Sequence, residues 1–374
     1  MDRYLHIVSF DVPWPANYGG VIDVFYKIKA LHAIGVKIIL HTYEYGRGEA
    51  EELNTYCEKV YYYRRDLAKT HLFKNIPYIV SSRNSEQLIN TLLRDKHPIL
   101  LEGLHTSILL NDIRFHGRKM VVRMHNIEHD YYYHLASAET DLFKKYYYYN
   151  EAKKLKRFER VLNRASAVIA ISRKDEKYFA SKYRNVSFIP AFHPHTEVKS
   201  STGQGSYVLY HGNLSVSENK NAIKFLLDEV FDDLKVPFVV AGLNPTPALK
   251  RLTADKPYVS LVANPDDEQM FKLINEAQLH LLITFQATGL KLKLLNTLYN
   301  GRFCLVNDKM LSGSTLDELC IVANDANAMK QQIKKLFKRS FSGREIQRRK
   351  TRLVQLYHNG HNVRRLIEIL FDND

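Results

Sequence analysis

The chain has 374 residues, more than a single hydrophobic core usually organises, so we expect two domains. Its 45% hydrophobic and 25% charged residues are typical of a globular protein, and no apolar run is long enough for a membrane span. The net charge of +14 favours polyanionic partners, which include nucleic acid, an anionic membrane surface and phosphorylated small molecules.

Strand-like and helix-like segments alternate along the N-terminal half of the chain. The predicted strands are 4–10, 36–43, 57–65, 98–104, 119–126 and 165–172. The predicted helices are 20–35, 85–96 and a long polar helix over 136–164. Strands that alternate with helices predict a doubly wound parallel sheet.

A polar, Ser/Gly-rich stretch interrupts this rhythm, and we interpret 196–206 as a linker. The pattern then restarts with strands 207–212, 236–242, 279–285 and 302–307 and helices 218–231, 265–277, 290–300, 325–338 and 342–371. The sequence therefore predicts an N-terminal domain over 1–195, a C-terminal domain over 207–345, and a C-terminal helix over 346–374 that packs back on the first domain. Two such domains would place a cleft between the carboxyl ends of their sheets, where open α/β sheets bind ligands.

Two stretches that follow predicted strands of the N-terminal half carry groups suited to ligand binding. Gly19 and Gly20 precede a helix, where the backbone can approach a ligand and the helix N-terminus favours an anion. Glu102 and His105 fall where the strand 98–104 runs out into a loop, and a histidine there can donate a hydrogen bond or act as a base. An ordinary strand–turn–helix connection and a structural histidine are the alternatives.

His125, Glu128 and His129 lie together after the strand 119–126 and resemble a metal cluster. The H-x-x-E-H pattern requires a helix and a further ligand, and nothing in the sequence supplies that ligand. We therefore favour a polar network at this position and expect no metal site.

A further group of candidates follows the first predicted strand of the C-terminal half. Gly212 and Asn213 end the strand, and Lys220 lies in the first turn of the next helix. Backbone donors together with a lysine suit a phosphate group. A surface lysine is the equally weighted alternative.

The apolar helix before the last predicted strand carries two lysines, Lys291 and Lys293. On a helical projection Lys293 shares a polar face with Asn296, next to the turn Thr288–Gly289, and Lys291 projects past the helix end. A lysine in a first turn is unfavourable against the helix dipole, and an anionic ligand would reverse that sign. A lysine that extends its ammonium group to solvent is the alternative.

Two segments are strongly basic. The segment 144–164 holds eight Lys and Arg against two Glu and interleaves them with tyrosines, and 330–350 holds nine against one. Such segments suit an anionic membrane or nucleic acid, although a solvated helix face explains each one singly. Because the first residues do not resemble a signal peptide and three cysteines form no disulfide framework, we expect a cytoplasmic protein at the inner face of the membrane.

Together these stretches resemble a family 4 glycosyltransferase of the GT-B fold over nearly the whole chain. The segments that carry the resemblance are "PWPANYGGVIDVFYKIKALHAIGVKI", "EGLHTS", "HNIEHDYY", "AISRKD", "HGNLSVSENKNAIKFL" and "TGLKLKLLNTLYNGRFCLVN". The resemblance implies two Rossmann-like, doubly wound domains that face a cleft. It also implies retaining, metal-independent transfer of a hexose from a nucleotide-diphosphate sugar to a glycan or lipid-linked acceptor, with no cofactor and no nucleic-acid partner.

The resemblance assigns roles to residues that match the family's motifs. The implied catalytic residues are His105, which would lie near the anomeric carbon, Glu102 and His125. The implied donor-binding residues are Gly19, Gly20, Gly212, Asn213, Lys220, Thr288, Gly289, Lys291, Lys293 and Asn296. Among these, Lys293 would bind the pyrophosphate and Asn296 the ribose.

One motif departs from the family. The acids of its E-x7-E pattern are replaced by Thr288 and Asn296. An amide can still bond a ribose hydroxyl, but more weakly than a carboxylate does. A non-catalytic or degenerate sugar-nucleotide-binding protein of the GT-B fold is therefore one alternative. A sugar-nucleotide epimerase that uses Glu102 and Glu128 is the other.

Overall fold

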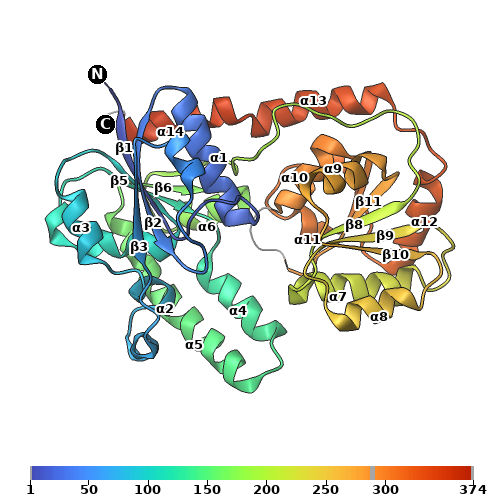
Figure 1. The fold of residues 1–374 in the computed structure, drawn as a ribbon, viewed down its shortest axis with the longest axis horizontal. Coiled ribbons are helices and arrows are strands. Elements are labelled where there is room, and N and C mark those ends of the chain that lie inside the picture. Colours follow the sequence, from blue (N-terminus) through green and yellow to red (C-terminus); the bar gives the residue numbers. More distant parts are fainter. Residues whose placement is uncertain (1, 287–290, 372–374) are drawn as a thin grey trace. The chain divides into compact units, whose positions relative to one another are not determined.

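The computed structural model describes residues 2–286 and 291–371, and these residues divide into two compact units. Unit 1 holds the described residues up to Pro194 and from Tyr357 onward, and unit 2 holds those from His195 to Leu356. Each unit is built around its own parallel sheet (Figure 1). The two parallel sheets confirm the predicted fold class.

The sheet of unit 1 has seven parallel strands in the order β3-β2-β1-β4-β5-β6-β7. The strands are β1 (Tyr4–Ser9), β2 (Lys37–Glu44), β3 (Lys59–Arg64), β4 (Ile99–Glu102), β5 (Met120–Met124), β6 (Ala167–Ala170) and β7 (Val186–Phe188). Ile7 of β1 pairs with Leu40 on one side and with Leu100 on the other. The strand order therefore reverses between β1 and β4, and at such a switch point ligands bind beyond the carboxyl ends of the strands.

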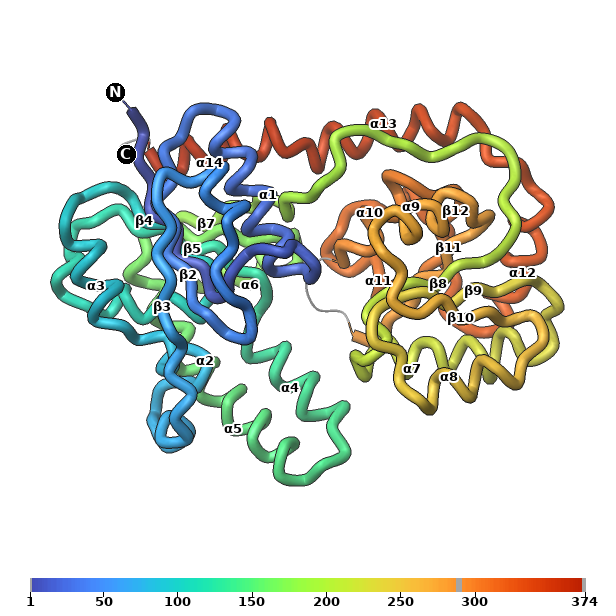
Figure 2. The backbone as a smooth tube through the Cα atoms, viewed as in Figure 1, coloured from blue at the N-terminus to red at the C-terminus, as the bar shows by residue number. Residues whose placement is uncertain are grey.

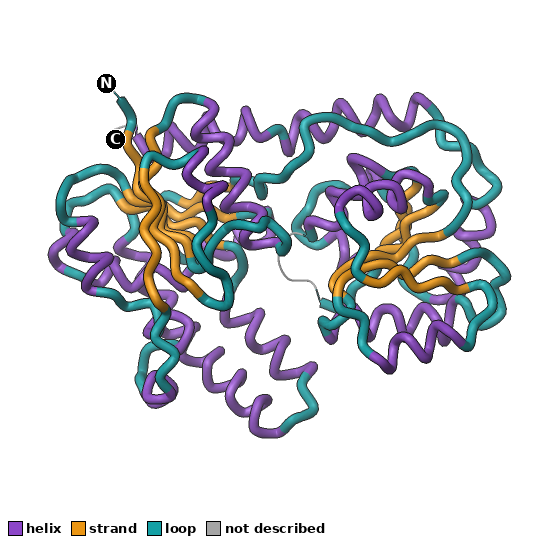
Figure 3. The backbone as a smooth tube through the Cα atoms, in the orientation of Figure 1, coloured by secondary structure: helices purple, strands orange, loops and turns teal. Residues whose placement is uncertain are grey.

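Helices cover both faces of this sheet (Figure 3). They are α1 (Gly19–Ala33), α2 (Tyr78–Ser81), α3 (Glu86–Leu92), α4 (Glu128–Ala138), α5 (Leu142–Phe158), α6 (Arg173–Ala180) and α14 (Asn359–Phe371). Because side chains alternate along a strand, Ile7 packs with α1 and α14 in one core, and Val8 packs with α3, α5 and α6 in the other. Burial on both faces explains why these strands are almost continuously apolar.

The sheet of unit 2 has six parallel strands in the order β10-β9-β8-β11-β12-β13. The strands are β8 (Val208–Asn213), β9 (Phe238–Leu243), β10 (Val259–Ala263), β11 (Leu279–Leu282), β12 (Phe303–Val306) and β13 (Ile321–Val322). The helices are α7 (Ser217–Phe225), α8 (Pro247–Ala254), α9 (Asp267–Glu276), α10 (Leu292–Asn300), α11 (Asp308–Leu311), α12 (Ala326–Leu336) and α13 (Gly343–Tyr357). The switch point lies between β8 and β11.

The prediction of one long helix over 136–164 is wrong. The chain instead forms α4 and α5, which run side by side as a hairpin (Figure 2). The break falls just before α5, where the Asp141 side chain accepts hydrogen bonds from the amides of Phe143 and Lys144. An aspartate at this position satisfies orphan amides and starts a new helix.

The connections between the two halves also differ in detail from the prediction. The segment interpreted as a linker is bonded to unit 2, because Lys199 donates to the Tyr299 carbonyl oxygen and Gly203 pairs with Phe341. The C-terminal segment forms two helices rather than one. Of these, α13 belongs mostly to unit 2, and α14 buries Val363 and Leu366 in the core that it shares with α1.

Within residues 2–286 and 291–371, no helix combines the length and the apolar character that crossing a membrane requires.

Candidate functional site

Four buried charged side chains form a network at the carboxyl end of the unit 1 sheet. Arg123 of β5 donates to both carboxylate oxygens of Asp23 in α1, at 2.6 and 2.8 Å. Lys27, one turn further along α1, lies 3.2 Å from Asp23 and 2.6 Å from Glu102 at the end of β4. Two cations and two carboxylates therefore neutralise one another in the protein interior. A buried charge requires such a partner.

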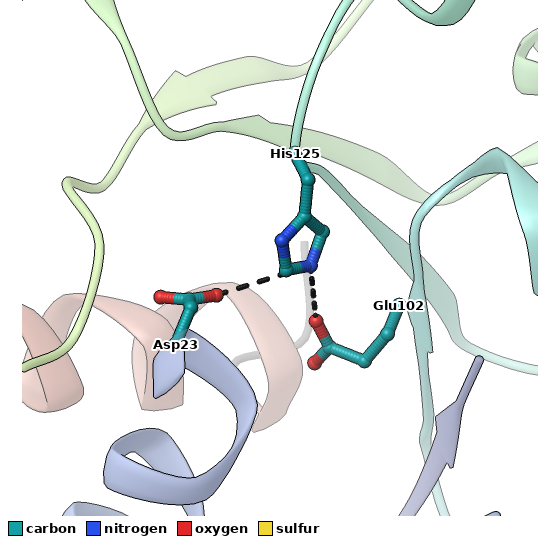
Figure 4. A group of neighbouring side chains, drawn as sticks. All are labelled: Asp23, Glu102 and His125. Carbon is teal, nitrogen blue, oxygen red and sulfur yellow. Dashed lines mark hydrogen bonds and ion pairs between the residues drawn. The ribbon is translucent and has the colours of Figure 1, made fainter. Parts of the chain in front are cut away.

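His125 is attached to this network through Glu102. Its Nε2 lies 2.9 Å from Oε2 of Glu102 and 3.9 Å from Oδ2 of Asp23 (Figure 4). Burial acts to raise the pKa of Glu102, but Lys27 and then His125 outweigh it, so the pKa of Glu102 is lowered. Glu102 thus stays ionised and fixes the orientation of the imidazole ring. Glu102 is fully buried and contacts Lys27 and His125, so we interpret it as a positioning residue for His125.

The ligand atoms of Asp23, Glu102 and His125 lie within 4.8 Å of one another, a spacing that could hold a metal ion. Both carboxylates are already paired with Arg123 and Lys27, however, so no negative charge is left over for a cation. We therefore interpret the group as an internal ion-pair network, and the expected absence of a metal in the reaction stays a prediction.

The metal-like cluster considered in the sequence does not form. His125 contacts Glu102, whereas His129 lies 3.2 Å from Glu159, a residue that precedes β6. Glu128 is buried, and its Oε1 has no hydrogen-bond partner among the described residues. Burial raises the pKa of Glu128 to about 8, so this carboxyl group is mostly protonated at neutral pH.

His105 lies one turn beyond β4, and its ring packs on Phe10 with the ring centroids 5.2 Å apart. Gly103 has a φ of 71°, and a Cβ there would lie 2.9 Å from Nδ1 of His105, so glycine permits this turn. Burial, followed by the charges of Arg83, His125 and Arg65, lowers the pKa of His105 well below its usual value. The ring is therefore neutral. Its Nδ1 is buried and has no hydrogen-bond partner among the described residues, so Nε2 is the nitrogen that could meet a ligand.

Gly19 and Gly20 form the first turn of α1, as the sequence predicts. A Cβ on Gly20 would lie 2.7 Å from Cζ of Phe10. Internal packing against the Phe10 ring therefore favours glycine at position 20, whatever else approaches this turn.

Unit 2 holds the second group of candidates, centred on Lys293 in the first turn of α10. Its Nζ lies 3.1 Å from Oδ1 of Asn219 and 3.3 Å from the hydroxyl of Tyr210, and neither partner is charged. Burial lowers the pKa of Lys293 to about 8. Lys291 differs, because its Nζ lies 3.8 Å from the carboxylate of Glu218.

The remaining polar residues of α10 lie close to the ends of β8. Asn296 accepts a hydrogen bond from Asn300 at 2.7 Å. Thr297 contacts Nε2 of His211, the residue before Gly212, at 3.1 Å. Burial lowers the pKa of His211 to about 3, with Lys293 as a further cause, so this imidazole is neutral.

The other donor-binding candidates of unit 2 surround the turn after β8. The Asn213 carbonyl oxygen accepts from the Asn219 side chain at 2.8 Å. Lys220 is half-buried, and its ammonium group has no hydrogen-bond or ion-pair partner among the described residues. Thr288 and Gly289 lie outside the described residues.

Sequence reasoning missed several residues of these two groups. Asp23 and Lys27 are four residues apart on the buried face of α1, and charges on an apolar helix face were a readable signal. Asn219 and Tyr210 carried no signal, because only the fold brings them to Lys293. Arg83, which lies between α2 and α3, carried none either.

The two parallel-sheet α/β domains define the GT-B fold. No known family model matches the chain. An uncharacterized 44.6 kDa protein in the cps region of Klebsiella pneumoniae is 27% identical over 341 residues, which cover 85% of this chain and 87% of that protein.

Solved structures agree on the architecture over both units. TarM superposes with a TM-score of 0.68 at 9% identity, covering 100% of this chain and 99% of its own. The lipopolysaccharide outer core galactosyltransferase WaaB superposes with a TM-score of 0.64 at 11% identity, covering 98% of this chain and 99% of its own. These likenesses confirm the predicted GT-B fold, and the assignment to family 4 stays a prediction.

Proposed function

We propose that the protein is a retaining glycosyltransferase that moves a hexose from a nucleotide-diphosphate sugar to a glycan or lipid-linked acceptor. The observation that carries this proposal is Lys293, a half-buried lysine in the first turn of α10, beside the switch point of unit 2, that forms no ion pair with any described residue. A diphosphate would supply the missing negative charge. The same lysine would stabilise the charge that develops on the diphosphate as it leaves.

Other residues of unit 2 extend the proposed donor site. Near the turn after β8, Lys220 offers a second cation, and no described residue pairs with it. Lys291 is the weaker candidate, because Glu218 already partly neutralises it. Asn296 retains its amide N–H groups for a ribose hydroxyl, since its bond to Asn300 uses only the oxygen.

In unit 1 we propose that His105 orients the transferred sugar through Nε2 and that His125 acts beside it. Both histidines pack against Phe10, with centroid distances of 5.2 and 5.4 Å. Glu102 would act through His125, which it holds at 2.9 Å. This arrangement disfavours the epimerase alternative, because Lys27 and His125 engage Glu102 as an ion-pair partner rather than leaving it as a free catalytic acid.

The proposed acceptor class is supported by the compared proteins. WaaB is a lipopolysaccharide outer core galactosyltransferase, and the relative from Klebsiella pneumoniae lies in a cps region. A glycan or lipid-linked glycan is therefore the acceptor that we propose. No cofactor and no metal is required in this scheme, because lysines and helix amides stabilise the leaving diphosphate.

The decisive experiment measures binding and turnover of a panel of nucleotide-diphosphate sugars by calorimetry and by release of the nucleoside diphosphate. We expect micromolar to millimolar binding of one donor and a loss of at least about tenfold in Lys293→Gln, since one charge-assisted contact is worth about 1.5–3 kcal/mol. Lys250→Gln is the matched control, because Lys250 is an exposed lysine of the same unit.

Two results would contradict parts of the proposal. Binding without turnover across donors and acceptors would favour the non-catalytic alternative. Equal affinity in Lys293→Gln and Lys250→Gln would remove the phosphate role of Lys293.

We also propose that the α4–α5 hairpin contacts an anionic membrane surface. Leu142 and Phe143, at the start of α5, are 78% and 89% exposed, and Lys144 and Lys145 follow them. Apolar side chains that can enter a bilayer next to cations that meet acidic headgroups fit such a surface. We expect salt-sensitive flotation with phosphatidylglycerol vesicles that is lost in the Leu142→Ser/Phe143→Ser variant. Equal flotation of both proteins would exclude this contact.

A further inference from the structure

Arg83 is a buried arginine that has no acidic partner among the described residues. The residue is 5% exposed. Its Nε donates to the carbonyl oxygen of Phe10 at 2.9 Å, and its Nη1 donates to that of Ile79 at 2.6 Å. Nη2 donates to no described residue, and it is not among the fully buried polar atoms that lack a partner, so a ligand could reach it. A guanidinium group that is removed from water without an anion costs free energy, and a bound anion would offset that cost.

A second arginine lies next to Arg83. Arg65, which follows β3, donates from Nε to Oγ of Ser82 at 2.9 Å, and its guanidinium group lies 4.4 Å from the ring centroid of Tyr45. Arg65 also forms no ion pair with any described residue. Burial and then the charge of Arg65 lower the pKa of Arg83 to about 10, so Arg83 remains cationic at neutral pH.

The acidic groups around this pair do not neutralise it. Asp11 accepts a hydrogen bond from the Tyr18 hydroxyl at 2.7 Å and lies 3.6 Å from Nε of Arg47. Glu128 is mostly protonated, because burial raises its pKa to about 8. The surroundings of Arg83 and Arg65 therefore keep a net positive charge.

The pair lies close to His105. Phe10 provides the carbonyl oxygen that holds Arg83, and its ring packs on the imidazole of His105. Two guanidinium groups beside a neutral imidazole can bind an anion and a neighbouring hydroxyl group together.

We propose that Arg83 and Arg65 form a subsite for a carboxylate or phosphate group carried by the acceptor. That the anion belongs to the acceptor rests on the proposed function, in which the donor diphosphate would bind at Lys293 in unit 2. Guanidinium forks match both carboxylate and phosphate oxygens, so the geometry defines an acidic acceptor, such as a uronic acid or a sugar phosphate.

The test uses the full-length protein in the Lys293→Gln background, which removes the proposed donor-phosphate site. The probes are D-glucuronate, α-D-glucose 1-phosphate and, as a neutral reference, methyl α-D-glucoside, each titrated by calorimetry. Arg65→Gln is the test variant, because Arg65 is half-buried and its loss leaves the bonds of Arg83 to Phe10 and Ile79 intact. Arg64→Gln is the matched control, since Arg64 is the exposed neighbour on the same strand end.

We expect Arg65→Gln to weaken binding of at least one acidic probe by about tenfold and Arg64→Gln to change it by less than about twofold. The probe that responds more strongly identifies the group as carboxylate or phosphate. No binding of either acidic probe, equal effects of the two substitutions, or equal binding of the neutral sugar would overturn the proposal. Circular dichroism of each variant establishes that it is folded.

The two proposals fail separately. If anion binding depends on Arg65 but no nucleotide sugar is bound or turned over, the subsite stands and the glycosyltransferase proposal falls. If a donor is turned over but Arg65→Gln leaves anion binding unchanged, the subsite falls and the proposed function stands.

Discussion

Lys293 is half-buried and has a lowered pKa, and this combination has a measurable consequence. Its pKa of about 8 means that the ammonium form, which the diphosphate requires, predominates below pH 8 and is lost above it. We expect the affinity for a nucleoside diphosphate to fall as the pH rises from 7 to 9.5, because the bound anion raises the lysine pKa, so the complex keeps a proton that the free protein loses above pH 8.

Lys293→Arg provides the control for this pH dependence. Arginine stays charged over the whole range, so the slope should disappear even if the affinity is lower at every pH. Calorimetric titrations of both proteins with the nucleoside diphosphate at four pH values would measure this slope. A slope in Lys293→Arg equal to that of the unmodified protein would assign the titration to another group.

The ion pair between Asp23 and Arg123 makes a second prediction at the scale of residues. Asp23→Asn leaves Arg123 and Lys27 with one carboxylate between them inside the protein, so we expect unit 1 to lose roughly 3–5 kcal/mol of unfolding free energy in urea denaturation. Arg123→Met should cost a similar amount.

The double variant Asp23→Asn/Arg123→Met should lose less than the sum of the two single effects, because each residue is costly mainly when its partner is missing. Strict additivity would show that the pair contributes no coupling energy.

At the scale of elements, the contact between β8 and β9 depends on a glycine. A Cβ on Gly242 would lie 1.7 Å from the carbonyl oxygen of Gly212, and backbone cannot yield as a side-chain tip can. We expect Gly242→Ala to lower the midpoint of thermal unfolding of unit 2 by several degrees, since the two strands must separate.

Gly343→Ala is the matched control for that substitution. A Cβ at Gly343, the first residue of α13, meets no atom within 4 Å, and alanine is the better helix former, so the midpoint should stay or rise. Equal midpoints for Gly242→Ala and Gly343→Ala would mean that β8 and β9 adjust freely.

The elements themselves show how far the sequence could be read. Long periodic segments such as α1 and strong apolar runs such as β1 were predicted, because their periodicity is a local property. The two-residue strand β13 and the short edge strand β7 were missed, since their pairing with β12 and β6 makes them strands. The α4–α5 hairpin was predicted as one helix. The continuous polar and basic pattern around Asp141 gave no sign that this residue caps a new helix.

At the scale of the whole molecule, buried neutral histidines predict acid sensitivity. Burial lowers the pKa of His6, His41 and His280 below the ordinary 6.5, that of His193 to about 4, and that of His211 to about 3. These histidines take up a proton near pH 6.5 in the unfolded chain, whereas in the folded chain they do so only at lower pH. Stability is therefore fully present above pH 6.5 and is lost as the pH falls towards the folded pKa values.

Each such histidine should cost roughly 1.4 kcal/mol per pH unit in this window. We expect the urea midpoint to fall continuously between pH 6.5 and 4.5. His41→Gln should flatten the slope, because one proton fewer is taken up on unfolding. An unchanged slope of the urea midpoint against pH in that variant would show that His41 does not contribute to the acid sensitivity.

The sequence alone determined the class of the fold, with its two parallel-sheet domains, and it proposed the candidate side chains. These follow from local patterns: alternating strands and helices, and polar groups placed just after strands, whose carboxyl ends share one edge of a parallel sheet. The same local logic placed Lys293 and Asn296 on one face of α10.

Only the tertiary structure decided which of these side chains are partners. Arg123 meets Asp23 across 100 residues of chain, and Lys293 meets Asn219 across 74. Strand order and helix packing set such pairs, and no short-range pattern encodes them. The same packing removed Glu102 from the free acids by pairing it with Lys27. It also left Arg83 buried without an ion-pair partner among the residues that the structure describes.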